Sequence, residues 1–421
     1  MAASTDLFER QGRDARHRLR GLMALVALLG ASACGGGGGD AGTEAASAAP
    51  SPAPAGAGPA PAPGPAPAPA PVAAATPAPA PWGSAKSSAR LFITGHSLAD
   101  NPLGDNVLLI ANGLIGSNAA KYNEQIVLGS PIRVRTEAQG DFSGYRLGKN
   151  RDGSNMNVID ELRNPQTLGG DRYDTLVIAE RFDLLGSLQY ENTVRNLRHF
   201  HERAIEGNAA ARTYFYETWA EIDDKSDPRA WIAHERAASP AWQCIATRIN
   251  TSLAAERRND RITALPIGAA LADLVERATQ GNVAGITGAN TSETVNRLFR
   301  DAVHLTPTAM YYAALLTYSA VYQRSPAGAP VPAGVSATAA ASLQAQAWSF
   351  VSNHYANSSP PDLDTCRAQV AQQFCPVYWS FRGNPGAIAG CTATFSAAST
   401  SNPLHYAAAS DASYWYRAPP R

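Results

Sequence analysis

The chain has 421 residues, and its 35 Lys and Arg residues balance its 35 Asp and Glu residues, so the formal net charge at pH 7 is zero. With no basic stripe in the folded part, this composition argues against a nucleic-acid partner. The sequence also has no phosphate-cradling glycine loop. The length is sufficient for one α/β domain with a substantial core after the low-complexity segments are set aside.

Residues 1–33 have the pattern of a secretory signal peptide, because several arginines precede an apolar run, residues 21–30, that is too short to span a membrane. The sequence Ala31-Ser32-Ala33-Cys34 resembles a bacterial lipobox, which implies lipidation of Cys34. The same small residues also suit ordinary signal-peptidase cleavage. We therefore expect the protein in the cell envelope, at the outer membrane or in the periplasm and attached to a bacterial membrane through Cys34, or else secreted.

Residues 34–86 have five glycines directly after Cys34 and continue with repeated Pro-Ala steps. Such a segment cannot bury a core, and its prolines favour extended polyproline II, so we interpret it as a disordered linker. A partner that recognises proline is the lesser alternative. The folded part is expected to consist of a domain at residues 87–330 and an extension at residues 331–421 that packs on it.

Short apolar strands alternate with amphipathic helices along the folded part. Strands are predicted at residues 90–94, 125–128, 175–179, 213–216 and 261–265, and helices at 106–115, 194–205, 269–279 and 306–322. The last helix begins with Thr306 as N-cap and Pro307 in its first turn. The order predicts a three-layer, flavodoxin-like α/β fold with a parallel five-stranded sheet, and loops at 151–170 and 220–239 that border a cleft.

Three residues have the chemistry of a nucleophilic site. Ser97 follows the first predicted strand, and Gly95 is expected to let the chain turn sharply out of that strand. Asp301 and His304 stand just before the last helix of the domain. A serine hydroxyl needs an imidazole to take its proton and a carboxylate to hold that imidazole in one tautomer, so the three residues together predict a catalytic triad.

This order of motifs resembles the SGNH or GDSL-type serine hydrolases. The resemblance implies their fold, with Ser97 as nucleophile, His304 as general base and acid, and Asp301 as the residue that orients His304. It also implies an oxyanion hole, to which the Ser97 region and Gly129 contribute. The chain departs from the family where His96 replaces the usual Asp, and we interpret His96 as structural.

The third family block, usually Gly-x-Asn-Asp, is replaced by Glu180-Arg181-Phe182-Asp183, so the Asn donor is missing. Arg181 is the candidate replacement in the oxyanion hole, with a surface ion pair as the alternative. The chain is also similar to a subgroup of SGNH-like bacterial proteins through Gly-His-Ser, Tyr-Asp-x-Leu-Val-x-x-Glu and Tyr-Glu-Thr-Trp. That similarity implies that Glu180, Glu217 and Trp219 line the substrate cleft.

Aromatic and sulfur-containing residues complete the candidate set. The tryptophans at positions 219, 231 and 242 are either stacking surfaces for sugar rings or parts of the core, the second being the ordinary role. Four cysteines remain after Cys34: Cys244, Cys366, Cys375 and Cys391. In an exported chain they predict two disulfides, for which three pairings are possible. One bridge should join the extension to the helix that holds Cys244. Their spacing gives no support to a metal site.

Three functions are consistent with these residues, and none needs a cofactor or metal. The first is a serine esterase that removes acyl groups, such as acetyl, from a carbohydrate or a small-molecule ester through an acyl-enzyme at Ser97. The second is an O-acyltransferase with the same triad. The third, suggested by the missing Asn, is a non-catalytic relative that binds glycans.

Overall fold

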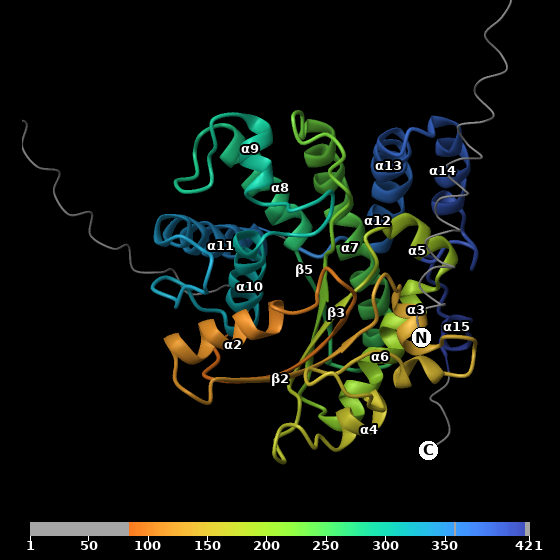
Figure 1. Ribbon diagram of the computed structural model, residues 1–421. Coiled ribbons are helices and arrows are strands. Elements are labelled where there is room, and N and C mark those ends of the chain that lie inside the picture. Colours follow the sequence, from red (N-terminus) through yellow and green to blue (C-terminus); the bar gives the residue numbers. More distant parts are fainter. Residues whose placement is uncertain (1–83, 358, 417–421) are drawn as a thin grey trace, which may run out of the picture. The chain divides into compact units, whose positions relative to one another are not determined.

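The five strands form one parallel sheet in the order β2-β1-β3-β4-β5, which is the flavodoxin-like order. The computed structural model describes residues 84–357 and 359–416 (Figure 1). The expectations for residues 1–33, for Cys34 and for residues 34–83 of the expected linker lie outside the described residues. The linker was predicted to extend too far, because Lys86 is bonded to the domain: its amide donates to the Tyr322 carbonyl at 2.9 Å. The predicted three-layer α/β fold is confirmed, since helices cover both faces of the sheet (Figure 1).

The strands are β1 (Ala89–Gly95), β2 (Ala120–Ile126), β3 (Thr175–Ala179), β4 (Arg212–Tyr216) and β5 (Ile262–Leu265). The α-helices are α2 (Leu103–Leu114), α3 (Ile132–Thr136), α4 (Val158–Arg163), α5 (Leu184–Tyr190), α6 (Thr193–Gly207), α7 (Arg229–Ala255), α8 (Ile267–Thr279), α9 (Thr291–Asn296), α10 (Pro307–Tyr322), α11 (Ala337–Asn357), α12 (Leu363–Gln369), α13 (Cys375–Phe381), α14 (Ile388–Ser396) and α15 (Asp411–Tyr414). Short 3-10 turns lie at η1 (Ser143–Arg146) and η3 (Pro385–Ala387), and a π-helical turn lies at η2 (Val370–Phe374).

The predicted position of the second strand was wrong by several residues. β2 spans Ala120–Ile126 rather than residues 125–128, and Leu128 is 65% exposed. The strand contains polar residues that are buried because they are hydrogen-bonded: the Gln125 amide donates to the main-chain carbonyls of Gly144 (2.9 Å) and Leu147 (3.1 Å). A strand whose interior side chains are partly polar does not show as an apolar run in the sequence, which is why its predicted position was wrong.

The loop predicted at residues 220–239 was too long, because α7 already begins at Arg229. Trp231 and Trp242 lie on this helix and are almost fully buried. Trp242 packs against Phe215 of β4, with 4.7 Å between the ring centroids. The ordinary role of these two tryptophans, core packing, is therefore the correct one.

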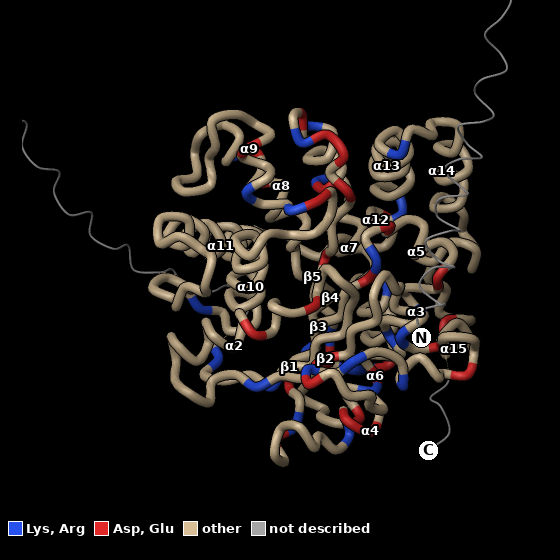
Figure 2. The backbone as a smooth tube through the Cα atoms, in the orientation of Figure 1, with Lys and Arg blue, Asp and Glu red and all other residues tan. Residues whose placement is uncertain are grey.

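Two hydrophobic cores cover the two faces of the sheet. On one face, Leu91 and Ile93 of β1 pack with α2, α8, α10 and α11; on the other, Phe92 packs with α6 and α7. Figure 2 shows that α10 and α11 carry no charged residues, and α10 is buried on all sides. Thr306 caps α10 as predicted, its hydroxyl accepting from the Ala309 amide.

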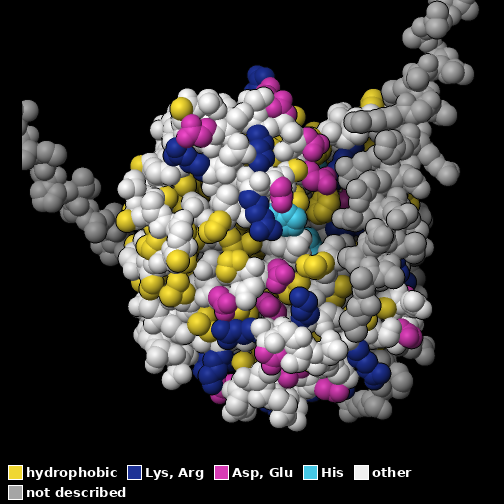
Figure 3. Space-filling model, in the orientation of Figure 1, with side chains coloured by type: hydrophobic (Ala, Val, Ile, Leu, Met, Phe, Trp, Pro, Cys, Tyr) yellow, Lys and Arg dark blue, Asp and Glu magenta, His cyan; other side chains and the backbone are white. Residues whose placement is uncertain are grey.

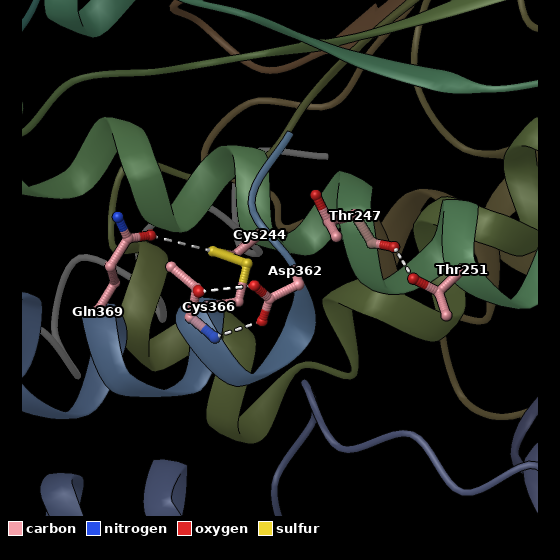
Figure 4. Close-up of a disulfide and its surroundings, with 7 residues drawn as sticks. Cys244, Thr247, Thr251, Asp362, Cys366 and Gln369 are labelled. Carbon is pink, nitrogen blue, oxygen red and sulfur yellow. Dashed lines mark hydrogen bonds between the residues drawn. A yellow bond between two sulfur atoms is a disulfide. The ribbon is translucent and has the colours of Figure 1, made fainter. Parts of the chain in front are cut away.

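The C-terminal extension packs on both faces, with α11 on the α10 side and α12 to α15 on the α7 side. The disulfides join Cys244 to Cys366 and Cys375 to Cys391. Figure 4 shows the first bridge linking α7 to α12, which confirms that one bridge ties the extension to the helix that holds Cys244. Within the described residues, none of the helices has both the length and the apolar character needed to cross a bilayer.

Candidate active site

The chain leaves β1 at Gly95, at the carboxyl edge of the sheet. A Cβ atom at this position would lie 2.6 Å from the Cβ of Ala99 and 3.4 Å from that of Ala179. Gly95 is the last residue of an extended strand, so it is required for space rather than for an unusual turn conformation, which corrects the expectation from the sequence. The absence of a side chain lets the segment after β1 fold back tightly, with Ser97 partly exposed.

Ser97, His304 and Asp301 come together although 207 positions separate the first two. The Ser97 hydroxyl oxygen lies 3.0 Å from His304 Nε2, and His304 Nδ1 lies 2.8 Å from Asp301 Oδ2. An ionised Asp301 can only accept at Oδ2, so Nδ1 carries the proton and Nε2 is left to accept from the Ser97 hydroxyl. The three side chains thus form a relay of the type used by serine hydrolases.

Asp301 has a second role in shaping its own loop. Its Oδ1 accepts from the amides of Val303 (2.9 Å) and His304 (2.7 Å). Partial burial alone would raise the pKa of Asp301, but the hydrogen bonds from these amides and from the imidazole lower that pKa to about 2. The carboxylate is therefore ionised at neutral pH, as an orienting group must be.

His96 does not take part in the relay. Its ring is almost fully buried, and its Nε2 lies 3.0 Å from the main-chain carbonyl of Glu180, to which it donates, since Leu98 N is directed at Nδ1. Burial, and then the positive charge of Arg135, lower the pKa of His96 to about 3, so the ring is neutral. His96 connects the ends of β1 and β3, in agreement with its interpretation as a structural residue.

The candidate oxyanion-hole residues lie after strands that neighbour β1. Gly129 follows β2, is exposed and has φ +66°, a conformation that favours glycine. The Val127 amide donates to the Gly95 carbonyl at 3.0 Å and so ties this loop to the segment that carries Ser97. Arg181 follows β3, is partly exposed, and has a guanidinium nitrogen 3.8 Å from Asp183 Oδ2.

The residues expected to line the substrate cleft are buried instead. Glu180 Oε1 accepts from the amides of Ile132 (3.0 Å) and Arg181 (2.7 Å), and Oε2 accepts from the Thr193 hydroxyl (2.7 Å). Burial raises the pKa of Glu180. This side chain holds the loops around the site together and is not available to substrate, because all three partners belong to the protein.

Glu217 and Trp219 also have no exposed surface to offer a ligand. Glu217 accepts from the Ser239 hydroxyl at 3.0 Å, and burial raises its pKa well above the usual value. The Trp219 indole nitrogen donates to the Val303 carbonyl at 2.7 Å. The motif that contains both residues is therefore part of the support beneath the site, which corrects the prediction that they contact substrate.

A buried polar network near the end of β1 was not predicted from the sequence. Arg135 is fully buried and donates to the Thr94 hydroxyl (2.7 Å) and to the Ala179 carbonyl. Burial lowers the pKa of Arg135 to about 10, which still leaves it charged at neutral pH. Thr94 in turn donates to Gln125 Oε1 at 2.9 Å, so the network joins β1, β2 and β3. The polar residues just before Ile126 are its only signal in the sequence.

The C-terminal extension reaches the loops that surround the site. The Tyr378 hydroxyl of α13 donates to Asp183, in the loop after β3, and Arg382 donates to Glu221, in the loop after β4, at 3.0 Å. The extension therefore helps to hold the loop that carries Arg181.

Figure 3 shows that histidine reaches the surface near the centre of the face drawn, between acidic and basic side chains.

Comparison with known proteins adds little about the site. No protein-family model matches the chain, and no curated protein matches it. Among solved structures, it is similar to a DUF4886 family protein from Bacteroides uniformis, with 13% sequence identity, a TM-score of 0.42, and coverage of 63% of this chain and 95% of that one.

Proposed function

We propose that this protein is a serine esterase of the SGNH type. The single observation that carries the proposal is the continuous relay from the Ser97 hydroxyl through His304 to Asp301, with distances of 3.0 and 2.8 Å. An ionised Asp301, a His304 tautomer set by that carboxylate, and a partly exposed Ser97 all support Ser97 as a nucleophile. The same geometry favours an enzyme over a relative that only binds glycans.

The reaction proceeds in two balanced steps. Ser97 Oγ attacks the ester carbonyl carbon while its proton passes to His304 Nε2, and collapse of the tetrahedral intermediate releases the alcohol, which takes that proton. Water then attacks the acyl-enzyme, again giving a proton to His304, and the carboxylic acid leaves with regeneration of Ser97. The negative oxygen formed in each step is stabilised by the amides of Ser97 and Gly129 and by the Arg181 guanidinium.

The exposure of the relay supports a substrate whose ester projects from a larger molecule. The His304 side chain is 29% exposed and the Asp301 side chain 49% exposed, so the site is open to solvent rather than deeply enclosed. An O-acetyl group on a carbohydrate of the cell envelope suits such a site and the expected lipid anchor at Cys34. We therefore propose an acylated carbohydrate or a similar ester as the substrate class.

Three variants test the proposal with a fluorophosphonate probe and p-nitrophenyl acetate. Ser97→Ala should abolish labelling, and Ser97→Ala and His304→Ala should each lower turnover by at least about 10³-fold. Asp301→Asn should have a similar or milder effect, because it disturbs the tautomer without removing the base. Ser117→Ala, an exposed serine before β2, is the matched control and should leave activity unchanged. Retained turnover in folded Ser97→Ala would reject the esterase.

The same assay separates hydrolysis from acyl transfer. With a sugar acceptor added, a hydrolase releases acetate in the same amount as p-nitrophenol. An O-acyltransferase instead places the acetyl group on the sugar, which mass spectrometry detects as an added acetyl mass. Acetylated sugar as the main product would replace hydrolysis with transfer while retaining the triad.

A further inference from the structure

Trp219 lies in the segment after β4, at a distance in sequence from the relay, yet it contacts the loop of Asp301 and His304. Its indole is fully buried, and its Nε1 donates to the Val303 carbonyl at 2.7 Å. The Ile222 amide in the same segment donates to the Ala302 carbonyl at 2.8 Å. Two successive carbonyls of the catalytic loop are therefore held from one side by residues 219–222.

The opposite side of the loop is held by Asp301. The carbonyl of Val303 and the amide of His304 belong to one planar peptide unit, which moves as a rigid body. Trp219 holds the carbonyl end of this unit at 2.7 Å, and Asp301 Oδ1 holds the amide end, also at 2.7 Å. Because the His304 side chain starts from the adjoining Cα, the orientation of this peptide unit sets where the imidazole points.

Trp219 is itself attached to the rigid part of the fold. The next residue, Ala220, is held at both main-chain groups by α7: its amide donates to Glu235 Oε1 (2.8 Å), and its carbonyl accepts from Trp231 Nε1 (2.8 Å). The Trp231 ring also packs edge-on against Phe299, with 5.4 Å between centroids, just before the catalytic loop. A continuous set of contacts therefore runs from α7 through Trp219 to His304.

We infer that Trp219 is a positioning residue for His304. It touches neither substrate nor the reacting atoms; it fixes the peptide unit from which the imidazole projects, and so keeps Nε2 within reach of the Ser97 hydroxyl. The inference rests on the proposed function, since it assigns a role within that reaction. A displacement of a catalytic group by about 1 Å can reduce the rate by about 10²-fold, so the loss of one hydrogen bond here should be visible in turnover.

The test replaces Trp219 by Phe, which removes the indole N–H and retains an aromatic ring. In Trp219→Phe, kcat for p-nitrophenyl acetate should fall by about 10- to 100-fold while KM stays within about twofold, and the rate of fluorophosphonate labelling should fall by the same factor as kcat. Trp242→Phe is the matched control: it alters an equally buried tryptophan that packs on Phe215, so it should lower the melting temperature by a similar amount with kcat unchanged.

Failure of the inference is distinguishable from failure of the proposed function. If Ser97→Ala is inactive but Trp219→Phe turns over like Trp242→Phe, only the positioning role is overturned; if Ser97→Ala is active, the esterase itself is rejected. Should Trp219→Phe not fold, hydrogen exchange of the wild-type protein gives the answer. An indole N–H at Trp219 that exchanges at least about 100-fold more slowly than an exposed one supports the contact, and exchange as fast as in free tryptophan overturns it.

Discussion

Gly95→Ala should damage the site through one identifiable contact. The added Cβ would lie 2.6 Å from the Ala99 Cβ, whereas ordinary carbon contacts are about 3.5–4.0 Å, so the segment after β1 must move by about 1 Å. Overpacking of this kind costs about 1–3 kcal/mol of the free energy of unfolding. The same movement displaces Ser97 from His304, and we expect labelling by a fluorophosphonate to slow by about 10²-fold.

A second substitution isolates that contact. Ala99→Gly removes the atom with which the new Cβ collides, so the double variant Gly95→Ala/Ala99→Gly should regain most of the labelling rate and at least about 1 kcal/mol of stability relative to the sum of the single variants. Urea denaturation of the four proteins in the cycle gives the stabilities, and fluorophosphonate kinetics gives the rates. Additivity of the two single changes within about 0.5 kcal/mol would show that the crowding at Ala99 is not the reason for glycine here.

Two further predictions concern stability. Burial raises the pKa of Glu217 well above its usual value of 4.5, so the folded protein retains this proton at pH values where the unfolded chain has lost it. Stability therefore falls as the pH rises above about 4.5, and in thermal melts Glu217→Gln should gain on the wild type as the pH rises from 5; a margin independent of pH is the contrary result. The Cys244–Cys366 bridge spans 122 positions and the Cys375–Cys391 bridge spans 16. Replacing both cysteines of a bridge by alanine should lower the free energy of unfolding, measured by urea denaturation, by about 5 kcal/mol for the first bridge and about 3 kcal/mol for the second. The reverse order would contradict the argument from loop entropy.

The sequence was informative where a residue's local pattern determines its structure. β1, β3, β4 and β5 were predicted to within one residue, since their side chains are apolar runs between turn residues. β2 was misplaced because its buried Gln125 is satisfied by carbonyls from distant segments, which no local pattern reveals. For the same reason the pairing of the four cysteines was left open, as it depends on how the extension packs.

The candidate site shows the same division. The spacing of Asp301 and His304 before α10 predicted their proximity, and the fold brings Ser97 to them. Motif similarity, however, only places a residue near the end of a strand; it does not say whether the side chain points to solvent or into the protein. Glu180 and Trp219 follow β3 and β4 at the same edge of the sheet as the site, but both side chains are buried and bind main-chain groups.

Glu180, which stands in the block where the SGNH-type hydrolases usually have an Asn donor, is bound entirely by groups of the protein. Its carbonyl accepts from His96 (3.0 Å) and from the Thr218 hydroxyl (2.9 Å), while its carboxyl group binds Ile132, Arg181 and Thr193. One residue thus ties together segments that follow β1, β2, β3 and β4. A side chain with all these partners inside the protein is not free to contact substrate. In the proposed reaction, a developing negative oxygen would be stabilised by neighbouring amides and by the next side chain, Arg181, whose main chain the Glu180 carboxyl group holds through the Arg181 amide.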